Sequence, residues 1–212
     1  MKRTILSVLA LSCVLSTSAL GSIVYNNTTP ANDTGDDLQY GSNTFSQLGD
    51  QIHLGGTDRL GTTATVEFFN LGSAGTFDAT LRLFGVGSPV GAQVGSDFTI
   101  VGISAVAADI FDVAFTLPGL LLPDDLIFTV SIANQSAGVQ IIGLEMYAPP
   151  PATGSSDASF AIANDGTNFV QTATVGENVF FELQATSVPE PATIAVGALG
   201  LLALMILRKH SA

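Results

Sequence analysis

The sequence predicts an all-β protein built around an antiparallel β-sandwich, and three observations support this. In several segments apolar and polar residues alternate, and a period of two residues is typical of strands with one buried face. Clusters of Gly, Asn, Asp, Ser and Pro separate these segments and predict turns. Between residues 22 and 187 no long amphipathic helical pattern stands out.

The alternation is clearest at residues 77–84, 111–117 and 126–132, where large apolar residues occupy most alternate positions. We expect further strands at residues 22–26, 51–54, 64–70, 98–104, 139–147, 159–163, 168–174 and 178–185. About ten short strands with frequent turns favour a sandwich of two antiparallel sheets.

Turn-forming residues predict where these strands end. We expect turns at residues 34–37, 71–75, 85–95, 123–125 and 164–166, and the Asn-Asp-Gly-Thr run at 164–167 predicts a tight hairpin. Residues 148–157 contain three successive prolines, which favour a stiff connection. Only three strands follow this connection, too few to fold alone, so we predict one domain over residues 22–187.

The N-terminal residues resemble a secretory signal peptide. Lys2 and Arg3 form a positive start, residues 5–15 are apolar, and Ala19 and Gly21 supply the small residues that signal peptidase requires. We therefore assign residues 1–21 to a signal peptide that is cleaved after Gly21.

The C-terminal residues have three elements in a fixed order. Pro189, Glu190 and Pro191 come first, residues 192–207 form an uncharged apolar run, and Arg208 and Lys209 follow. We expect residues 192–207 to form a transmembrane helix, which the two basic residues hold at the cytoplasmic side as a stop-transfer signal. The prolines keep Glu190 in an extended, accessible stretch. A plain membrane anchor without processing is the alternative.

This arrangement resembles the PEP-CTERM sorting signal of bacterial exopolysaccharide-associated proteins, with residues 188–212 as the sorting region. The resemblance implies that an exosortase, a membrane-embedded transpeptidase-like protease, recognises the Pro-Glu-Pro motif. It also implies an inner-membrane intermediate, followed by transfer to the cell surface or the extracellular matrix, with exopolysaccharide as a candidate partner.

Residues 22–187 also resemble a recurrent type of PEP-CTERM ectodomain. The resemblance rests on the Val-Tyr-Asn-Asn run at 24–27, the Leu-Gly-Asp-Gln-Ile-His-Leu-Gly-Gly-Thr run at 48–57 and the Arg-Leu-Phe run at 82–84. Residues 153–157 and 180–183 fit it as well. It implies a jelly-roll-like sandwich and no particular activity.

Composition excludes several functions. Of the 18 acidic residues only Glu190 lies outside residues 22–187, and the only arginines or lysines inside that range are Arg59 and Arg82. Such an acidic chain is unsuited to binding nucleic acid, which requires positive charge. The single cysteine, Cys13, falls in the signal peptide, so we expect no disulfide, thiol nucleophile or cysteine zinc site in the mature chain.

Catalytic and metal-binding residues are sparse. His53 is the only histidine of residues 22–187 and fits a structural role, so the usual nucleophile–base pairs are missing and we predict that the protein is not an enzyme. Asp33, Asp36 and Asp37 offer hard oxygen ligands and form a candidate Ca²⁺ site, for which an ordinary Asx-rich turn is the alternative. We expect no other cofactor.

Three classes of function remain open from the sequence. The first is a structural or adhesive component of the cell surface or extracellular matrix, and the second is a carbohydrate-binding sandwich module. The third and weakest is a secreted glycan hydrolase, because carboxylates are plentiful. Trp is absent, which weakens an inference of sugar stacking.

Overall fold

The computed structural model describes residues 21–28, 33–40, 46–87, 90–139, 141–148, 150–156, 161–164, 169–172 and 178–188. These residues form strands and turns and include no helix. None of them belongs to a helix of the length and apolarity that crossing a membrane requires. The predicted signal peptide, Pro-Glu-Pro motif, apolar run and basic residues lie outside the described residues, apart from Gly21.

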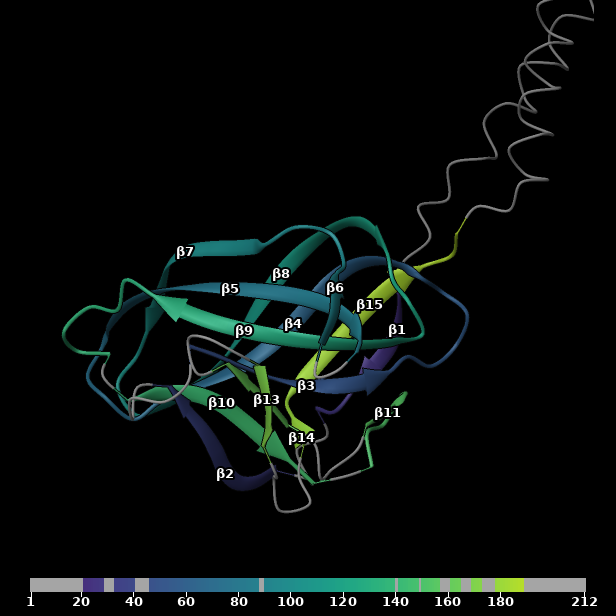
Figure 1. The fold of residues 1–212 in the computed structure, drawn as a ribbon. Coiled ribbons are helices and arrows are strands. Elements are labelled where there is room, and N and C mark those ends of the chain that lie inside the picture. The colour runs from purple at the N-terminus through teal and green to yellow at the C-terminus, as the bar shows by residue number, and fades with distance from the viewer. Residues whose placement is uncertain are drawn as a thin grey trace, which may run out of the picture.

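One antiparallel sheet, sheet A, has seven strands (Figure 1). They are β1 (Ser22–Asn26), β2 (Asp33–Tyr40), β4 (Leu60–Asn70), β8 (Asp109–Leu121), β10 (Ile142–Tyr147), β14 (Asn178–Val179) and β15 (Phe181–Thr186). Strand β4 is its centre: β8 pairs along one edge, while β15 and β10 share the other edge. Strand β1 then pairs with β15, and β2 with β10.

The second antiparallel sheet, sheet B, has eight strands. They are β3 (Gln47–His53), β5 (Gly75–Val86), β6 (Val90–Gln93), β7 (Phe98–Ala105), β9 (Asp125–Ala133), β11 (Ser155–Ser156), β12 (Ala161–Asn164) and β13 (Phe169–Thr172). The order β3, β9, β5 forms the middle, with β12 and β11 along β3 and with β7 and β6 along β5.

The two sheets pack through one continuous apolar core. Phe128 of β9 stacks on Phe181 of β15 with ring centroids 3.9 Å apart, and Phe68 of β4 contacts Phe77 of β5 at 5.3 Å. Each pair joins residues of opposite sheets, and most inward residues of the central strands are buried, whereas Phe98, Ile100 and Phe111 near the β7–β8 edge are only partly buried. The all-β prediction with antiparallel sheets is therefore confirmed, and the packing is that of a β-sandwich.

Most predicted strands appear at the expected places. Strand β1 has the predicted bounds, and β4, β5, β8 and β9 extend the predicted segments by a few residues. Strands β12 and β13 pair with Asn164 opposite Phe169, as the predicted hairpin requires. The jelly-roll-like topology and the domain boundaries stay predictions.

The turn predicted at residues 34–37 is wrong. Asp33–Tyr40 forms strand β2, which pairs with β10 from Asp37 to Tyr40 and again at Asp33, with a register shift between. The Gly-Asp composition predicted a turn, but the free edge of β10 supplies backbone partners, and such long-range pairing overrides local preference. The turn predicted at 85–95 and the connection predicted at 148–157 are likewise interrupted by the short strands β6 and β11.

Candidate functional site

The end of β15 is the point where the chain leaves the sandwich toward the predicted sorting region. Strand β15 is paired on both sides, because Ala185 lies opposite Ser22 of β1 and Thr186 lies opposite Leu60 of β4. The predicted mature N-terminus at Ser22 and the departure of the tail are thus adjacent at one end of the molecule (Figure 1).

A loop between β3 and β4 holds this end of β15. The backbone N–H of Arg59 donates to the Thr186 carbonyl at 3.1 Å, and the Arg59 carbonyl accepts from the Leu122 N–H at 2.8 Å. The Ser22 hydroxyl donates to the carboxylate of Asp58 at 2.5 Å. Residue Arg59 therefore connects the last residue of β15 to the chain that follows β8.

The Arg59 side chain fixes the loop itself. Its Nε donates to Oδ1 of Asp124 at 2.7 Å, and its other nitrogens donate to the carbonyls of Gly55, Gly56 and Asp58 at 3.2, 3.1 and 2.8 Å. Only 15% of the side chain is exposed. A guanidinium has five N–H groups in a rigid fork, so one side chain can satisfy several carbonyls of a loop.

Asp50 of β3 is buried on the core side of sheet B, beside Leu48 and Ile52 in the alternation. Its carboxylate accepts from the N–H of Gln51 at 2.7 Å and from the N–H of Val179 in β14 at 3.3 Å. A buried carboxylate is costly unless it is hydrogen-bonded, so these contacts explain how it is tolerated. Asp50 thereby bonds across the sandwich to the strand that precedes β15.

Tyr25 of β1 lies near the same carboxylate. Burial, and then the negative charge of Asp50, raise the pKa of the Tyr25 phenol far above its ordinary value. Its hydroxyl therefore stays protonated and donates to the Ser156 hydroxyl at 3.1 Å. The segment Gln47–Arg59 thus contacts both the first and the last strands of the sandwich, and we call it the terminal clamp.

Glycine at position 49 is required by the pairing of β3 with β9. A Cβ added there would lie 1.8 Å from the carbonyl oxygen of Phe128, which is backbone and has no room to move. At Gly55 the N–H donates to the Val24 carbonyl at 2.7 Å, so β1 is also attached to the clamp.

His53 is exposed rather than enclosed in an apolar strand. Its Nδ1 lies 2.7 Å from Oδ1 of Asp125, its register partner on β9, with the two side chains 53% and 58% exposed. A hydrogen bond this open is a surface contact between two neighbouring strands.

The candidate Ca²⁺ site stays a prediction. The backbone of Asp33, Asp36 and Asp37 lies in β2, whereas their side chains lie outside what the structure describes. Among the described side chains there is no group of three or more His, Cys, Asp or Glu arranged to hold a metal ion.

The outer face of sheet A carries a row of carboxyl groups. Glu67 of β4 lies opposite Asp112 of β8, and burial raises the pKa of Asp112, an effect that its hydrogen bond with Glu67 opposes and the charge of Glu182 reinforces. The Tyr147 hydroxyl donates to Glu67 at 3.0 Å, and Asn26 donates to Glu182 at 2.9 Å.

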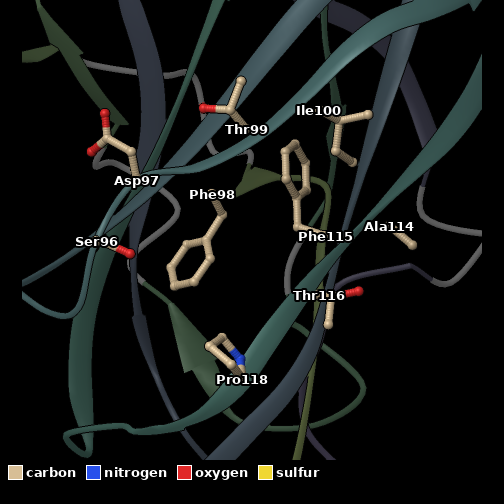
Figure 2. Close-up of a pocket in the computed structure, with 9 residues that line it drawn as sticks. All are labelled: Ser96, Asp97, Phe98, Thr99, Ile100, Ala114, Phe115, Thr116 and Pro118. Carbon is tan, nitrogen blue, oxygen red and sulfur yellow. The ribbon is translucent and has the colours of Figure 1, made fainter.

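A cleft of about 450 Å³ lies between β7 and β8, the strands at facing edges of the two sheets (Figure 2). The Phe98 ring points toward Pro118, while the Asp97 and Thr99 side chains are directed the other way. Asp97 is held by Arg82, whose Nε and Nη2 donate to its two carboxylate oxygens at 3.0 and 2.7 Å.

Sequence reasoning did not identify Asp50 and Arg59 as functional residues. Both lie in the run that carried the ectodomain resemblance or next to it, and Arg59 is one of only two arginines between residues 22 and 187. The rarity of arginine was the available signal for Arg59. The contacts of both side chains, however, involve strands that are far away in the sequence.

Comparison with known families bears on the tail. Residues 187–209 match the model of the PEP-CTERM protein-sorting motif. The chain carries a PEP-CTERM sorting motif. This motif implies export, a membrane-anchored intermediate and processing by an exosortase-type enzyme, as the sequence predicted. The match begins at Ser187, directly after β15 ends at Thr186.

The other comparisons are less informative. The chain is similar to a chain in the structure of infectious bursal disease virus Gt strain, with 15% identity over 87% of this chain and 50% of that one and a TM-score of 0.35. A chain of the Gx strain matches with 11% identity, 86% and 47% coverage and a TM-score of 0.32. This chain spans about half the length of both, and these scores support no conclusion. The search of curated proteins found no match.

Proposed function

We propose that the protein is an exported, non-enzymatic component of the cell surface or of an exopolysaccharide matrix. The observation that carries this proposal is the sorting motif, which begins at the residue after β15. In the proposed sequence of events, signal peptidase removes residues 1–21, residues 192–207 hold the chain in the membrane, and an exosortase-type enzyme acts at Pro189-Glu190-Pro191.

The terminal clamp supports a role in which the tail bears load before processing, while residues 192–207 still hold the chain in the membrane. A chain held in a membrane by residues 192–207 pulls on the end of β15. That strand is hydrogen-bonded to β1 on one side and β4 on the other, and the Thr186 carbonyl accepts from Arg59. The pull is therefore opposed by two rows of backbone hydrogen bonds, which resist it together along the strand.

Mass spectrometry of the intact protein from its own host tests the sorting proposal. We expect a chain that begins at Ser22 and has lost Arg208, Lys209 and the apolar run. Changing Pro189, Glu190 and Pro191 to alanine should leave the tail in place and the protein in the membrane fraction.

The matched control changes Ser187 and Val188 to alanine, which alters the two residues between β15 and Pro189 and keeps Pro189, Glu190 and Pro191. This variant should be processed like the natural chain. A natural chain that still ends at Ala212 in a host with its sorting enzyme would contradict the proposal and favour a plain anchor.

A carbohydrate-binding module is the second candidate function. The cleft between β7 and β8 favours it, because an aromatic ring, a proline ring and several hydroxyl groups line one open depression.

A further inference from the structure

We propose that the cleft between β7 and β8 binds a neutral glycan chain. Its walls come from two edge strands: Phe98 and Thr99 lie on β7, and Ala114, Thr116 and Pro118 lie on β8. The volume of about 450 Å³ is within the usual size of small-molecule sites, about 300–1,000 Å³. The inference rests on the proposed function in one respect: a location at the cell surface or in the matrix is where the protein would meet glycans.

The lining has the two kinds of surface that a sugar ring needs. The partly buried Phe98 ring points from β7 toward Pro118 of β8, so both walls of the cleft offer apolar surface (Figure 2). An aromatic face carries partial negative charge and attracts the C–H groups of a sugar ring. Ser96 and Thr116 also belong to the lining, and their hydroxyl groups can both donate to and accept from sugar hydroxyls.

The charge of the cleft favours a neutral ligand. Asp97 is the only charged residue among those that line it, and its carboxylate is paired with Arg82 through two hydrogen bonds. Gln93 donates to the same carboxylate at 2.9 Å. No net positive charge is left in the lining to attract uronates or phosphates, and the chain as a whole repels them with a net charge of −12.

A peptide strand is a poorer occupant of this cleft. Strand addition needs a regular edge with free N–H groups, and Pro118 has none. The pairing of β8 with β4 also shifts register between Thr116 and Leu120, and Gly119 has φ of 67°. This irregularity interrupts the edge of β8, a device that protects edge strands from pairing with other chains.

Nuclear magnetic resonance titration of the mature protein from its host tests the proposal, with Ile100 and Ala114 methyl groups as reporters. The probes are neutral hexasaccharides of β-glucan, α-glucan, mannan and xylan, an anionic hexagalacturonate, and a hexapeptide of alternating Thr and Val. We expect at least one neutral hexasaccharide to shift both methyl signals in a saturable way.

Three variants locate the binding. Phe98→Leu keeps the side chain apolar but removes the ring and should weaken binding about five-fold. Ala114→Gln fills the cleft from an exposed position and should abolish it. Ala92→Gln is the matched control, an exposed alanine on β6 away from the lining, and should bind like the natural protein.

Other outcomes overturn the proposal. Saturable shifts with the uronate or the peptide alone would assign the cleft to another ligand, and the absence of shifts with every neutral sugar would exclude the site. Neutral binding that Ala114→Gln leaves unchanged would place the site elsewhere. Each of these results is independent of the mass of the processed chain, so the sorting proposal stands or fails separately.

Discussion

Arg59 and Arg82 each bind an aspartate, but they serve two regions of the molecule in different ways. In the terminal clamp, Arg59 donates most of its side-chain hydrogen bonds to backbone carbonyls of one loop, and its side chain is 15% exposed. On the outer face of sheet B, Arg82 binds Asp97 and the Ser131 hydroxyl, and its side chain is 23% exposed while that of Asp97 is 46% exposed.

The difference indicates separate roles for the two regions. The clamp uses buried polar groups, Asp50 among them, to hold backbone segments that are distant in the sequence. The Arg82 region arranges polar side chains at the rim of an open cleft, where they hold one another. Substitutions in the clamp should therefore affect mainly folding stability. Substitutions near Arg82 should affect mainly the arrangement of exposed side chains at the rim of the cleft.

The largest expected effect is that of a methyl group at Gly49. In Gly49→Ala the new Cβ overlaps the Phe128 backbone, so β3 and β9 must separate, and we expect a loss of about 3 kcal/mol or more in unfolding free energy. Gly85→Ala in the Arg82 region is the control, since its Cβ meets only the Ala92 carbonyl at 3.8 Å. Urea unfolding of both variants measures the difference, and equal losses would contradict it.

Alanine substitutions of the two arginines should also lower the unfolding free energy by different amounts, but the difference should be smaller than that for the two glycines. Arg59→Ala leaves several loop carbonyls without their donor, and we expect a loss of about 2 kcal/mol in unfolding free energy. Arg82→Ala breaks an ion pair whose carboxylate is well exposed, and we expect less than about 1 kcal/mol. Thermal unfolding at one pH compares them. A larger loss for Arg82→Ala would show that the clamp is not held as we describe.

Replacing the buried amide of Asn178, which lies next to the Val179 that donates to Asp50, should raise folding stability. Neither side-chain polar atom of Asn178 has a hydrogen-bond partner in the part of the chain that the structure describes, although the residue is fully buried. We expect Asn178→Leu to gain about 1 kcal/mol in unfolding free energy. The buried Asn27 is the control, because its amide donates to the Asn178 and Val179 carbonyls. Asn27→Leu should lower the melting temperature, and a decrease for both variants would contradict the prediction.

The smallest expected effects concern how folding stability depends on pH through Asp112 and Asp97, and the two residues act in opposite directions. Burial raises the pKa of Asp112 above its ordinary 3.8, so its contribution to stability is present at lower pH and is lost as pH rises through the folded-state pKa. The hydrogen bond from Arg82 lowers the pKa of Asp97, whose contribution is present above 3.8 and is lost as pH falls through the folded-state pKa.

Two asparagine variants measure this contrast. At pH 7, Asp112→Asn should be more stable than the natural protein and Asp97→Asn less stable, and both differences should shrink as pH falls through the acid range. Melting temperatures over that range give the result. A common sign for the two variants at pH 7 would contradict the assignment of causes.

Much of the fold could be predicted because its signals are local. Alternation of period two located the strands at 77–84, 111–117 and 126–132, since each strand of a sandwich buries one face whichever strands it pairs with. The sorting motif was equally readable, because an enzyme recognises it as a short linear run. Composition alone also removed cysteine chemistry from residues 22–187.

Only the tertiary structure decided which residues meet. Nothing near Asp33–Tyr40 in the sequence indicated a strand, because its partner β10 lies about a hundred residues further on. The burial of Asp50, the contact of Arg59 with Thr186 and the cleft at Phe98 likewise depend on pairings between distant strands. A sequence pattern reports the face that a residue presents, whereas long-range register determines what that face contacts.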